Sequence, residues 1–226
     1  MDATVTSLDI VPPERRASSS FADGSRKPMS TVVLHLEEGG CQSIMLPVRA
    51  ARILEGEELD LPCGKSAAFD TIRAAEARAC YATLIDMLSR RDHATKEAAD
   101  KLASYGYRRQ AIDSAVARAT ASRYLDDGRF VSNFIDERKA RGWGRRKIEA
   151  ELKRRGIDVA DIEDYPDAYF TEENDLERAR ALLERRSIPT TNAFERLVRF
   201  LMSRGFSYGV AAEAVRERLN TASDPS

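Results

Sequence analysis

One short pattern occurs three times in the chain and limits the possible folds more than any other feature of the sequence. The copies read LASYGY, LKRRGI and LMSRGF, and their glycines, Gly106, Gly156 and Gly205, lie 50 and 49 residues apart. In each copy a leucine stands four residues before the glycine, and an aromatic or branched residue follows it. Glycine can adopt the left-handed conformation that ends a helix, after which the next apolar residue packs back on the last turn. The pattern therefore predicts three copies of one helical unit.

Helical patterns flank each copy. The segments upstream end in cations, and we expect helices there at 84–91, 130–141 and 176–186. Further helices are expected downstream, at 111–121, 159–168 and 210–219. Residues that commonly cap helices stand at the expected starts, namely Thr95, Asp158, Thr171, Asn192 and Ser207, with Asp126 or Asp127 opening the second copy.

We therefore predict three tandem three-helix repeats, at residues 66–125, 126–170 and 171–220, followed by a tail at 221–226. A three-helix unit of this size is near the lower limit for independent folding, so the copies should share surface with one another. Units that stack in this way form an elongated, curved array with a large exposed face.

The first 60 residues show a different pattern. Two β-prone runs, 31–36 and 41–46, are joined by Glu-Glu-Gly-Gly, which is typical of a hairpin, and 5–11 can add a third strand. A short helix should begin at Pro47 and stop at Gly56. Residues 12–28 are rich in Ser, Arg and Pro and predict a mobile loop. We thus expect a mostly α fold, preceded by a small β-hairpin and helix module at residues 1–60.

Several functional classes find little support in the sequence. Cys41, Cys63 and Cys80 have the spacing of neither a disulfide framework nor a zinc site, and the chain contains only two histidines. The triplet Gly64-Lys65-Ser66 resembles the end of a phosphate-binding loop, but Leu59 stands where that loop needs a glycine. Ser66 is better interpreted as the N-cap of the helix that follows. We expect no catalytic residue, no metal site and no cofactor.

No apolar run approaches the roughly 20 residues that span a bilayer, and the amino terminus lacks the cations of a signal peptide. The sequence therefore predicts a cytoplasmic protein with no membrane contact.

Three segments resemble one known family. They read LSRRDHATKEAADKLASYGY at 88–107, YLDDGRFVSNFIDERKARGWGRRKIEAELKRRGI at 124–157, and FLMSRGFSYGVAAEAV at 200–215. Together they resemble the RecX family of bacterial regulatory proteins, over most of residues 70–219. Two features depart from the family pattern. The third helix of the second repeat is acidic and interrupted by Pro166, and the linker at 12–28 is longer than expected.

The resemblance implies a function as well as a fold. RecX-like proteins are not enzymes; they bind the RecA recombinase in the groove of its filament on DNA, and they limit filament growth, ATPase activity and strand exchange. Contact with single- or double-stranded DNA is also attributed to the family. The resemblance thus implies a monomeric regulator in DNA repair, homologous recombination and the SOS response.

A basic segment at residues 138–155 is the candidate contact surface. It holds nine cations and two carboxylates in a chain whose net charge is −1. The candidate partner- or DNA-binding residues are Arg138, Lys139, Arg141, Arg145, Arg146, Lys147, Lys153, Arg154 and Arg155. We expect Ile148 and Leu152 to face the core and the six cations from Arg145 onward to lie largely outside.

Three interpretations of this segment stay open on the sequence alone. It can be a solvated surface, because Glu149 and Glu151 relieve its charge at helical spacing. It can bind a protein partner of mixed charge, because nine carboxylates and no cation follow at 158–177. It can also serve a DNA-binding protein built of tandem helix-turn-helix-like modules. The isoelectric point near 6.2 argues against a dedicated DNA-binding protein.

Two further groups of cations are weaker candidates. One lies in the first repeat: Arg108, Arg109, Arg118 and Arg123. The other lies in the third repeat: Arg178, Arg180, Arg185, Arg186, Arg196 and Arg199. Modest contacts on linked modules act as one multivalent attachment, because the first contact raises the effective concentration of the next.

Overall fold

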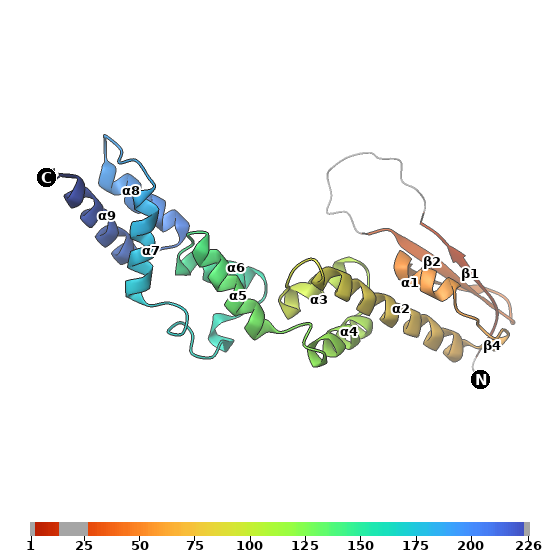
Figure 1. Cartoon of the computed structure of the whole chain (residues 1–226). Helices are drawn as coiled ribbons and strands as arrows, with labels where there is room; N and C mark the ends of the chain where they lie inside the picture. The colour runs from red at the N-terminus through yellow and green to blue at the C-terminus, as the bar shows by residue number, and fades with distance from the viewer. Residues whose placement is uncertain (1–2, 14–26, 224–226) are drawn as a thin grey trace. The chain divides into compact units, whose positions relative to one another are not determined.

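The structure is a computed structural model that describes residues 3–13 and 27–223. Its contacts divide the chain into two compact units, Met1–Asp126 and Asp127–Ser226. The chain is mostly helical, with a small antiparallel sheet near the amino terminus, as the sequence predicted (Figure 1). The predicted mobile loop at 12–28 falls largely outside the described residues.

The sheet of the first unit has four antiparallel strands in the order β3-β2-β1-β4. Their bounds are β1 (Thr4–Val11), β2 (Met29–Leu36), β3 (Cys41–Pro47) and β4 (Cys63–Gly64). The hairpin turn contains Gly39 and Gly40, whose φ angles of 88° and 91° few other residues tolerate. The hairpin and the third strand are confirmed. Strand β4 was not predicted, because two residues carry no alternating pattern.

Among the described residues of the first unit, four helices accompany the sheet. They are α1 (Val48–Glu55), α2 (Lys65–Leu88), α3 (Thr95–Ser104) and α4 (Arg109–Ala121). Gly64 is the N-cap of α2, so the prediction that Ser66 caps this helix is wrong. The helix starts two residues earlier, because the chain enters it directly from β4, where Cys63 and Gly64 pair with β1.

One hydrophobic core joins the sheet to the first three-helix repeat. It includes Leu34 of the sheet, Leu54 of α1, Ile72 and Leu84 of α2, and Leu102 of α3, all fully or almost fully buried. The helix α1 packs against β2, β3 and α2. The amino-terminal module and the first repeat therefore form one folding unit.

A buried ion pair fixes the start of α4 in this unit. The carboxylate of Glu76, which is only 2% exposed, accepts hydrogen bonds from the backbone N–H and the Nε of Arg108, at 2.8 and 2.6 Å. A buried carboxylate requires such partners to offset the cost of leaving water. Arg108 therefore holds α4 in place, and it is not free to bind a partner.

The described part of the second unit, residues 127–223, contains five α-helices. They are α5 (Asp127–Ala140), α6 (Arg145–Arg154), α7 (Glu172–Glu184), α8 (Ala193–Arg204) and α9 (Tyr208–Ser223). Thr171 caps α7 through a hydrogen bond from the backbone N–H of Asn174, and Ser207 accepts one from Val210 in the first turn of α9. A core at the carboxyl end of the unit joins α7, α8 and α9 around Leu183, Leu201 and Phe206.

The predicted helix at 159–168 is wrong. Only a single 3₁₀ turn, η1 (Val159–Asp161), forms there, with Asp158 capping it, and turns continue to residue 169. Pro166 lacks the N–H that a helix needs and disfavours a helical conformation in the residue before it. Carboxylates spaced three or four residues apart, such as Asp161 and Asp164, would also repel one another along a helix. The second repeat thus has two α-helices and a short turn.

The threefold sequence pattern corresponds to the same turn in all three places. Gly106, Gly156 and Gly205 have φ angles of 89°, 84° and 99°. The residue after each glycine donates a backbone hydrogen bond to the leucine of the pattern, at 3.4, 3.0 and 3.2 Å. All three leucines are fully buried. This is the Schellman arrangement, and the predicted recurrence is confirmed.

Candidate interaction site on α5 and α6

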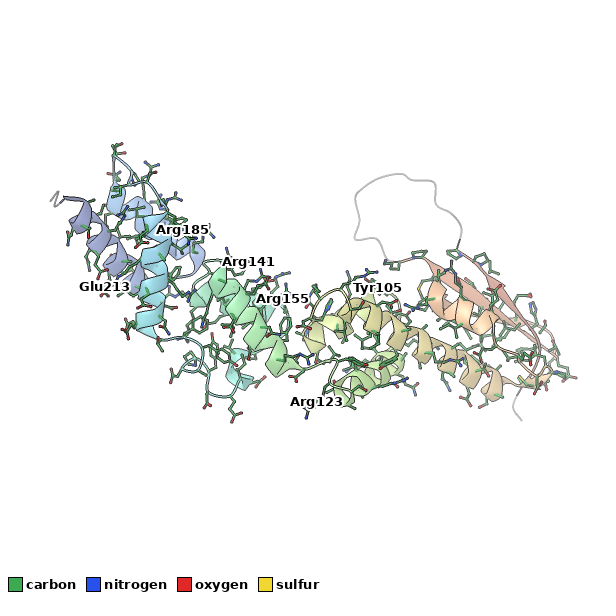
Figure 2. All side chains as sticks on the ribbon, in the orientation of Figure 1. Tyr105, Arg123, Arg141, Arg155, Arg185 and Glu213 are labelled. Atoms are coloured by element: carbon green, nitrogen blue, oxygen red, sulfur yellow. The ribbon has the colours of Figure 1, made fainter. Side chains whose placement is uncertain are left out.

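The basic segment at 138–155 spans the end of α5, a tight turn and the whole of α6. Gly142 ends α5 with a φ of 76°, and the backbone N–H groups of Gly142 and Trp143 donate to the carbonyls of Lys139 and Arg138, at 2.8 and 3.0 Å. The turn sends the chain into α6, where Ile148 and Leu152 face inward and are fully buried, as predicted. Figure 2 shows Arg141 and Arg155 at the ends of α5 and α6.

The start of α6 is joined by backbone contacts to the glycine turn after α8. The N–H of Gly144 donates to the carbonyl of Arg204 at 2.9 Å, and the N–H of Arg146 donates to the carbonyl of Gly205 at 3.0 Å. A Cβ atom on Gly144 would lie 2.4 Å from the carbonyl carbon of Gly205, so no larger residue fits without movement. The second repeat is therefore fixed to the third through the first turn of α6.

Two of the nine predicted site residues make contacts inside the second unit. The guanidinium of Arg138 lies over the rings of Phe134 and Trp143, at 4.7 and 4.9 Å, and its Nε atom is buried. Lys139 donates a hydrogen bond to the carbonyl of Tyr169 and lies 4.7 Å from the ring of Phe170. Both cations hold α5 against its neighbours.

Burial, followed by the nearby guanidinium of Arg178, lowers the pKa of Lys139 below its usual range. Arg178 bridges the second and third repeats, because it donates to both the carboxylate of Asp175 and the carbonyl of Trp143. Burial raises the pKa of Asp175. These half-buried charges stabilise the contact between repeats and leave little charge for a partner.

Four predicted site residues form ion pairs within the segment. Arg141 pairs with Glu137 at 2.5 Å, and Arg145 pairs with Glu149 at 2.7 Å. The remaining two, Arg154 and Arg155, pair with Glu151 at 2.6 and 3.1 Å.

Three cations of α6 are less exposed than expected. The side chain of Arg155 is only 15% exposed and lies over Phe134. Arg145 and Lys147 are half-buried, and the ammonium of Lys147 lies 4.4 Å from the ring of Trp143. The expectation that all six cations of α6 lie largely outside is therefore wrong for Arg145, Lys147 and Arg155. Aromatic side chains of neighbouring turns cover them, which the sequence spacing does not reveal.

Two predicted site residues remain exposed and unpartnered. The side chains of Arg146 and Lys153 make no ion pair, hydrogen bond or ring contact with another described residue. They are seven residues apart, with the exposed Ala150 between them, so they share one face of α6. The structure thus reduces nine candidate residues to two free cations on one helical face.

An acidic surface adjoins this face along the chain. Eight of the nine carboxylates at 158–177 are exposed, and only Asp175 is buried. The acidic segment contacts α6 through Tyr165, whose hydroxyl donates to Glu149 at 2.9 Å and whose ring lies 5.5 Å from Arg145. The acidic segment is thus attached to α6 by direct contacts through Tyr165.

Other features of the described residues offer little for chemistry. No group of His, Cys, Asp and Glu side chains suited to a metal ion is found among them, and none of their helices is long and apolar enough to cross a membrane. Burial and the charge of Glu76 raise the pKa of the Cys80 thiol to about 12, so it is a poor nucleophile.

Comparison with known proteins supports the repeat. The family model described as "RecX, second three-helix domain" matches residues 126–165. The regulatory protein RecX of Vibrio vulnificus (strain CMCP6) is 33% identical over 134 residues, covering 57% of this chain and 86% of the relative. The regulatory protein RecX of Stenotrophomonas maltophilia (strain K279a) is 37% identical over 102 residues, which cover 45% of this chain and 61% of that relative, less than two thirds of its length.

Two crystal structures share the fold. One of a regulatory protein RecX covers 95% of this chain and 99% of its own, with a TM-score of 0.57 at 17% identity. RecX from Lactobacillus salivarius covers 64% of this chain and 97% of its own, with a TM-score of 0.56 at 21% identity.

The fold and the matching family model define a class of proteins that contain a three-helix domain, and the relatives are named regulatory proteins. This chain belongs to the RecX family.

Proposed function

We propose that this protein is a non-catalytic regulator of the RecA recombinase that acts as a monomer in the cytoplasm. It binds in the groove of the RecA filament on DNA and limits filament growth, ATPase activity and strand exchange. Membership of a family whose members are named regulatory proteins supports this proposal. The chemistry of its exposed surface supports it independently.

The observation that carries the proposal concerns two neighbouring segments of the chain: a helix with two unpaired, exposed cations is followed by an acidic segment. Arg146 and Lys153 project from one face of α6, and eight exposed carboxylates follow at 158–177. Adjacent patches of opposite sign suit a partner that itself mixes charges, such as a protein filament wrapped around DNA. At this surface, the acidic patch would repel a naked nucleic acid.

The test reverses the two free cations in the variant Arg146→Glu/Lys153→Glu. Neither side chain has a partner among the described residues, so the helical content should be unchanged by circular dichroism. We expect roughly a tenfold or larger loss of inhibition of the DNA-dependent ATPase of RecA, because like charges across an interface cost several kcal/mol. The matched control, Arg52→Glu/Arg90→Glu, changes two exposed arginines of the first unit by the same total charge. Full inhibition by the folded α6 variant would rule out this surface.

The earlier candidates Arg138, Lys139 and Arg145 are poor targets for such a test. Each has an internal partner, so its reversal would disturb the fold before it disturbed a contact. Loss of inhibition in those variants would not separate the two causes.

A second candidate function is direct DNA binding by tandem helix-turn-helix-like modules. The observation that favours it is a group of unpaired arginines on the third repeat, described below. A gel shift with naked DNA at physiological salt, with a defined footprint and no recombinase, would support this alternative.

A further inference from the structure

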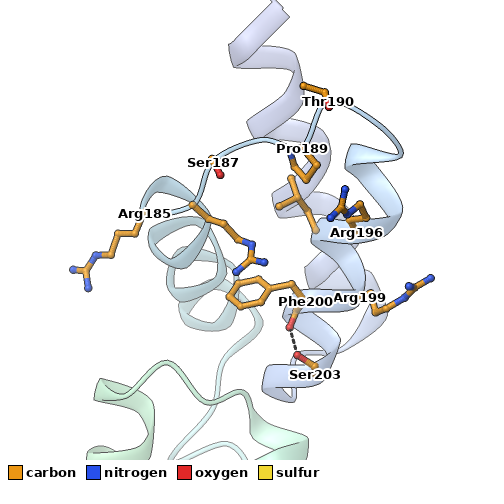
Figure 3. Close-up of a pocket in the computed structure, with 10 residues that line it drawn as sticks. Arg185, Ser187, Pro189, Thr190, Arg196, Arg199, Phe200 and Ser203 are labelled. Atoms are coloured by element: carbon orange, nitrogen blue, oxygen red, sulfur yellow. Dashed lines mark hydrogen bonds between the residues drawn. The ribbon is translucent and has the colours of Figure 1, made fainter.

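A hollow on the third repeat is bordered by four arginines, Arg185, Arg186, Arg196 and Arg199, and by no carboxylate. It lies between the end of α7, the loop that follows and one side of α8 (Figure 3). Arg185 extends from the end of α7, whereas Arg196 and Arg199 extend from α8; the Arg185 and Arg199 side chains point away from each other, to opposite sides of the hollow (Figure 3). We call this hollow the arginine groove.

The arginines of the groove differ from other arginines of the same unit. Arg178 is bonded to Asp175, and Arg180 pairs with Glu217 through two hydrogen bonds of 2.5 and 2.6 Å. By contrast, no ion pair, hydrogen bond or ring contact joins the side chains of three groove residues to any described residue. These are Arg185, Arg196 and Arg199, all exposed.

Local carboxylates do not neutralise the groove. Glu184 and Glu195 stand next to groove arginines in the sequence, and Glu195 is four residues before Arg199, yet neither forms an ion pair among the described residues. The groove therefore keeps its positive charge, although the chain as a whole has a net charge of −1.

Helix stabilisation accounts for only part of this arrangement. Arg185 is the C-cap of α7 and Arg186 follows it, where cations interact favourably with the helix dipole. Arg196 lies near the amino end of α8, where the same dipole disfavours a cation. The cations of the α8 wall thus have no evident role within the fold.

The apolar side chains of the groove are unavailable as anchors. Leu197 is buried, and Phe200 lies beneath the guanidinium of Arg186 at 4.1 Å and beside that of Arg204 at 5.4 Å. Protein partners derive most of their affinity from a few residues, often Trp, Tyr or Arg, that fill well-packed pockets. A ligand of this groove must instead bind through charge and hydrogen bonds.

We propose that the arginine groove binds the phosphodiester backbone of a nucleic-acid strand. A guanidinium presents a planar fork of donors that matches two phosphate oxygens. Arginines on two walls of one groove can contact successive phosphates, while Ser187 and Thr190 supply hydroxyl groups at the edge. Contacts to phosphate carry no sequence information, so we expect binding that is independent of sequence. This site adds a DNA contact to the proposed function but is argued from the groove alone.

The test measures binding of a labelled oligothymidine by fluorescence anisotropy, with the full chain and no recombinase. We expect Arg185→Ala/Arg196→Ala/Arg199→Ala to bind roughly tenfold or more weakly. The dependence of log Kd on log salt should also become shallower by about two, because each of the three lost phosphate contacts removes roughly 0.7 of a unit of slope on a single strand. Because the assay lacks recombinase, its failure would leave the ATPase proposal standing.

The matched control is Arg52→Ala/Arg73→Ala/Arg90→Ala, which removes the same charge from the first unit. It should keep the wild-type affinity and slope. A third variant, Arg185→Lys/Arg196→Lys/Arg199→Lys, keeps the charge but loses the planar fork, so it should keep most of the salt slope and bind more weakly. Circular dichroism checks that all three variants fold.

Three results would overturn the proposal. The first is wild-type affinity and slope in the alanine variant of the groove. The second is an equal loss in the control. The third is selectivity for another anion. If the groove variant loses binding only to a polyglutamate peptide, the groove serves an acidic protein segment; if pyrophosphate binds the wild type as tightly as the oligonucleotide, it serves a small phosphate compound.

Discussion

At the scale of single residues, identical glycines of the repeat face different neighbours. A Cβ atom on Gly106 would meet the side chain of Met29, with its Sδ atom 2.5 Å away. A Cβ atom on Gly205 would lie 2.5 Å from the backbone nitrogen of Lys147. The end of a methionine can move aside, whereas the backbone of α6 is held by its own hydrogen bonds. Equivalent positions in the sequence thus have different tolerance to substitution.

We predict that Gly205→Ala destabilises the protein more than Gly106→Ala does. Both variants pay about 1–2 kcal/mol for a left-handed conformation. Gly205→Ala should lose about a further 1–3 kcal/mol, because the added methyl forces the start of α6 away from the turn after α8. Denaturant unfolding followed by circular dichroism measures both losses. Equal losses would show that α6 yields as easily as a methionine side chain.

At the scale of elements, α6 combines a structural and an exposed face. Ile148 and Leu152 bury one side, whereas Arg146 and Lys153 leave the other free. Between them, Glu151 accepts hydrogen bonds from Arg154 at 2.8 and 2.6 Å and from Arg155 at 3.1 Å. These bonds, mainly those from Arg154, lower the pKa of Glu151.

This lowered pKa predicts a pH dependence of the second unit. The stabilisation is present above about pH 4.3, the ordinary pKa of glutamate, and is lost as the pH falls through the lower pKa of the folded state. Wild type should exceed Glu151→Gln in free energy of unfolding by about 1 kcal/mol or less at pH 7, because Arg154 is exposed. The difference should shrink as the pH falls below this value and vanish once Glu151 is protonated in the folded state.

Chemical unfolding of both proteins across this pH range measures the effect. Glu173→Gln is the control, because Glu173 is exposed and has no ion pair among the described residues. A difference that stays constant with pH would show that ionisation of Glu151 contributes nothing.

At the scale of the whole molecule, the chain is divided into two units with separate cores. The first core runs from Val5 to Leu125, and another lies within α7, α8 and α9. The sequence predicted that domains end at residues 60, 125 and 170, and these boundaries stay predictions. The contacts place their division at Asp126, and they join the amino-terminal module to the first repeat.

We predict that a fragment of residues 1–126 folds alone, whereas a fragment of residues 1–60 does not. The shorter fragment lacks α2, whose Ile72 and Leu84 are fully buried in the shared core. Each such side chain contributes roughly 2 kcal/mol to the free energy of unfolding when it is buried. A small sheet without this contribution is too weakly stabilised to fold. Circular dichroism and thermal unfolding of both fragments check this. Cooperative unfolding of the 1–60 fragment would contradict the shared core.

Features that depend on local chemistry could be predicted from the amino-acid order alone. A glycine with a leucine four residues before it ends a helix in the same way wherever it occurs, so Gly106, Gly156 and Gly205 revealed the repeat. The hairpin was predicted for the same reason, because Gly39 and Gly40 suit its turn. Pro166 also indicated locally that a helix is disfavoured, yet a helix was predicted at 159–168.

Which cations are exposed and unpaired could not be predicted, because it depends on tertiary contacts. Nine residues of the basic segment look equivalent in the sequence, yet Arg138 and Lys139 are held by rings and carbonyls from distant turns. The arginine groove likewise forms because Arg185 and Arg196, separated by a loop, border one hollow. Charge can be counted along a chain, but whether it is available depends on partners that folding brings from elsewhere.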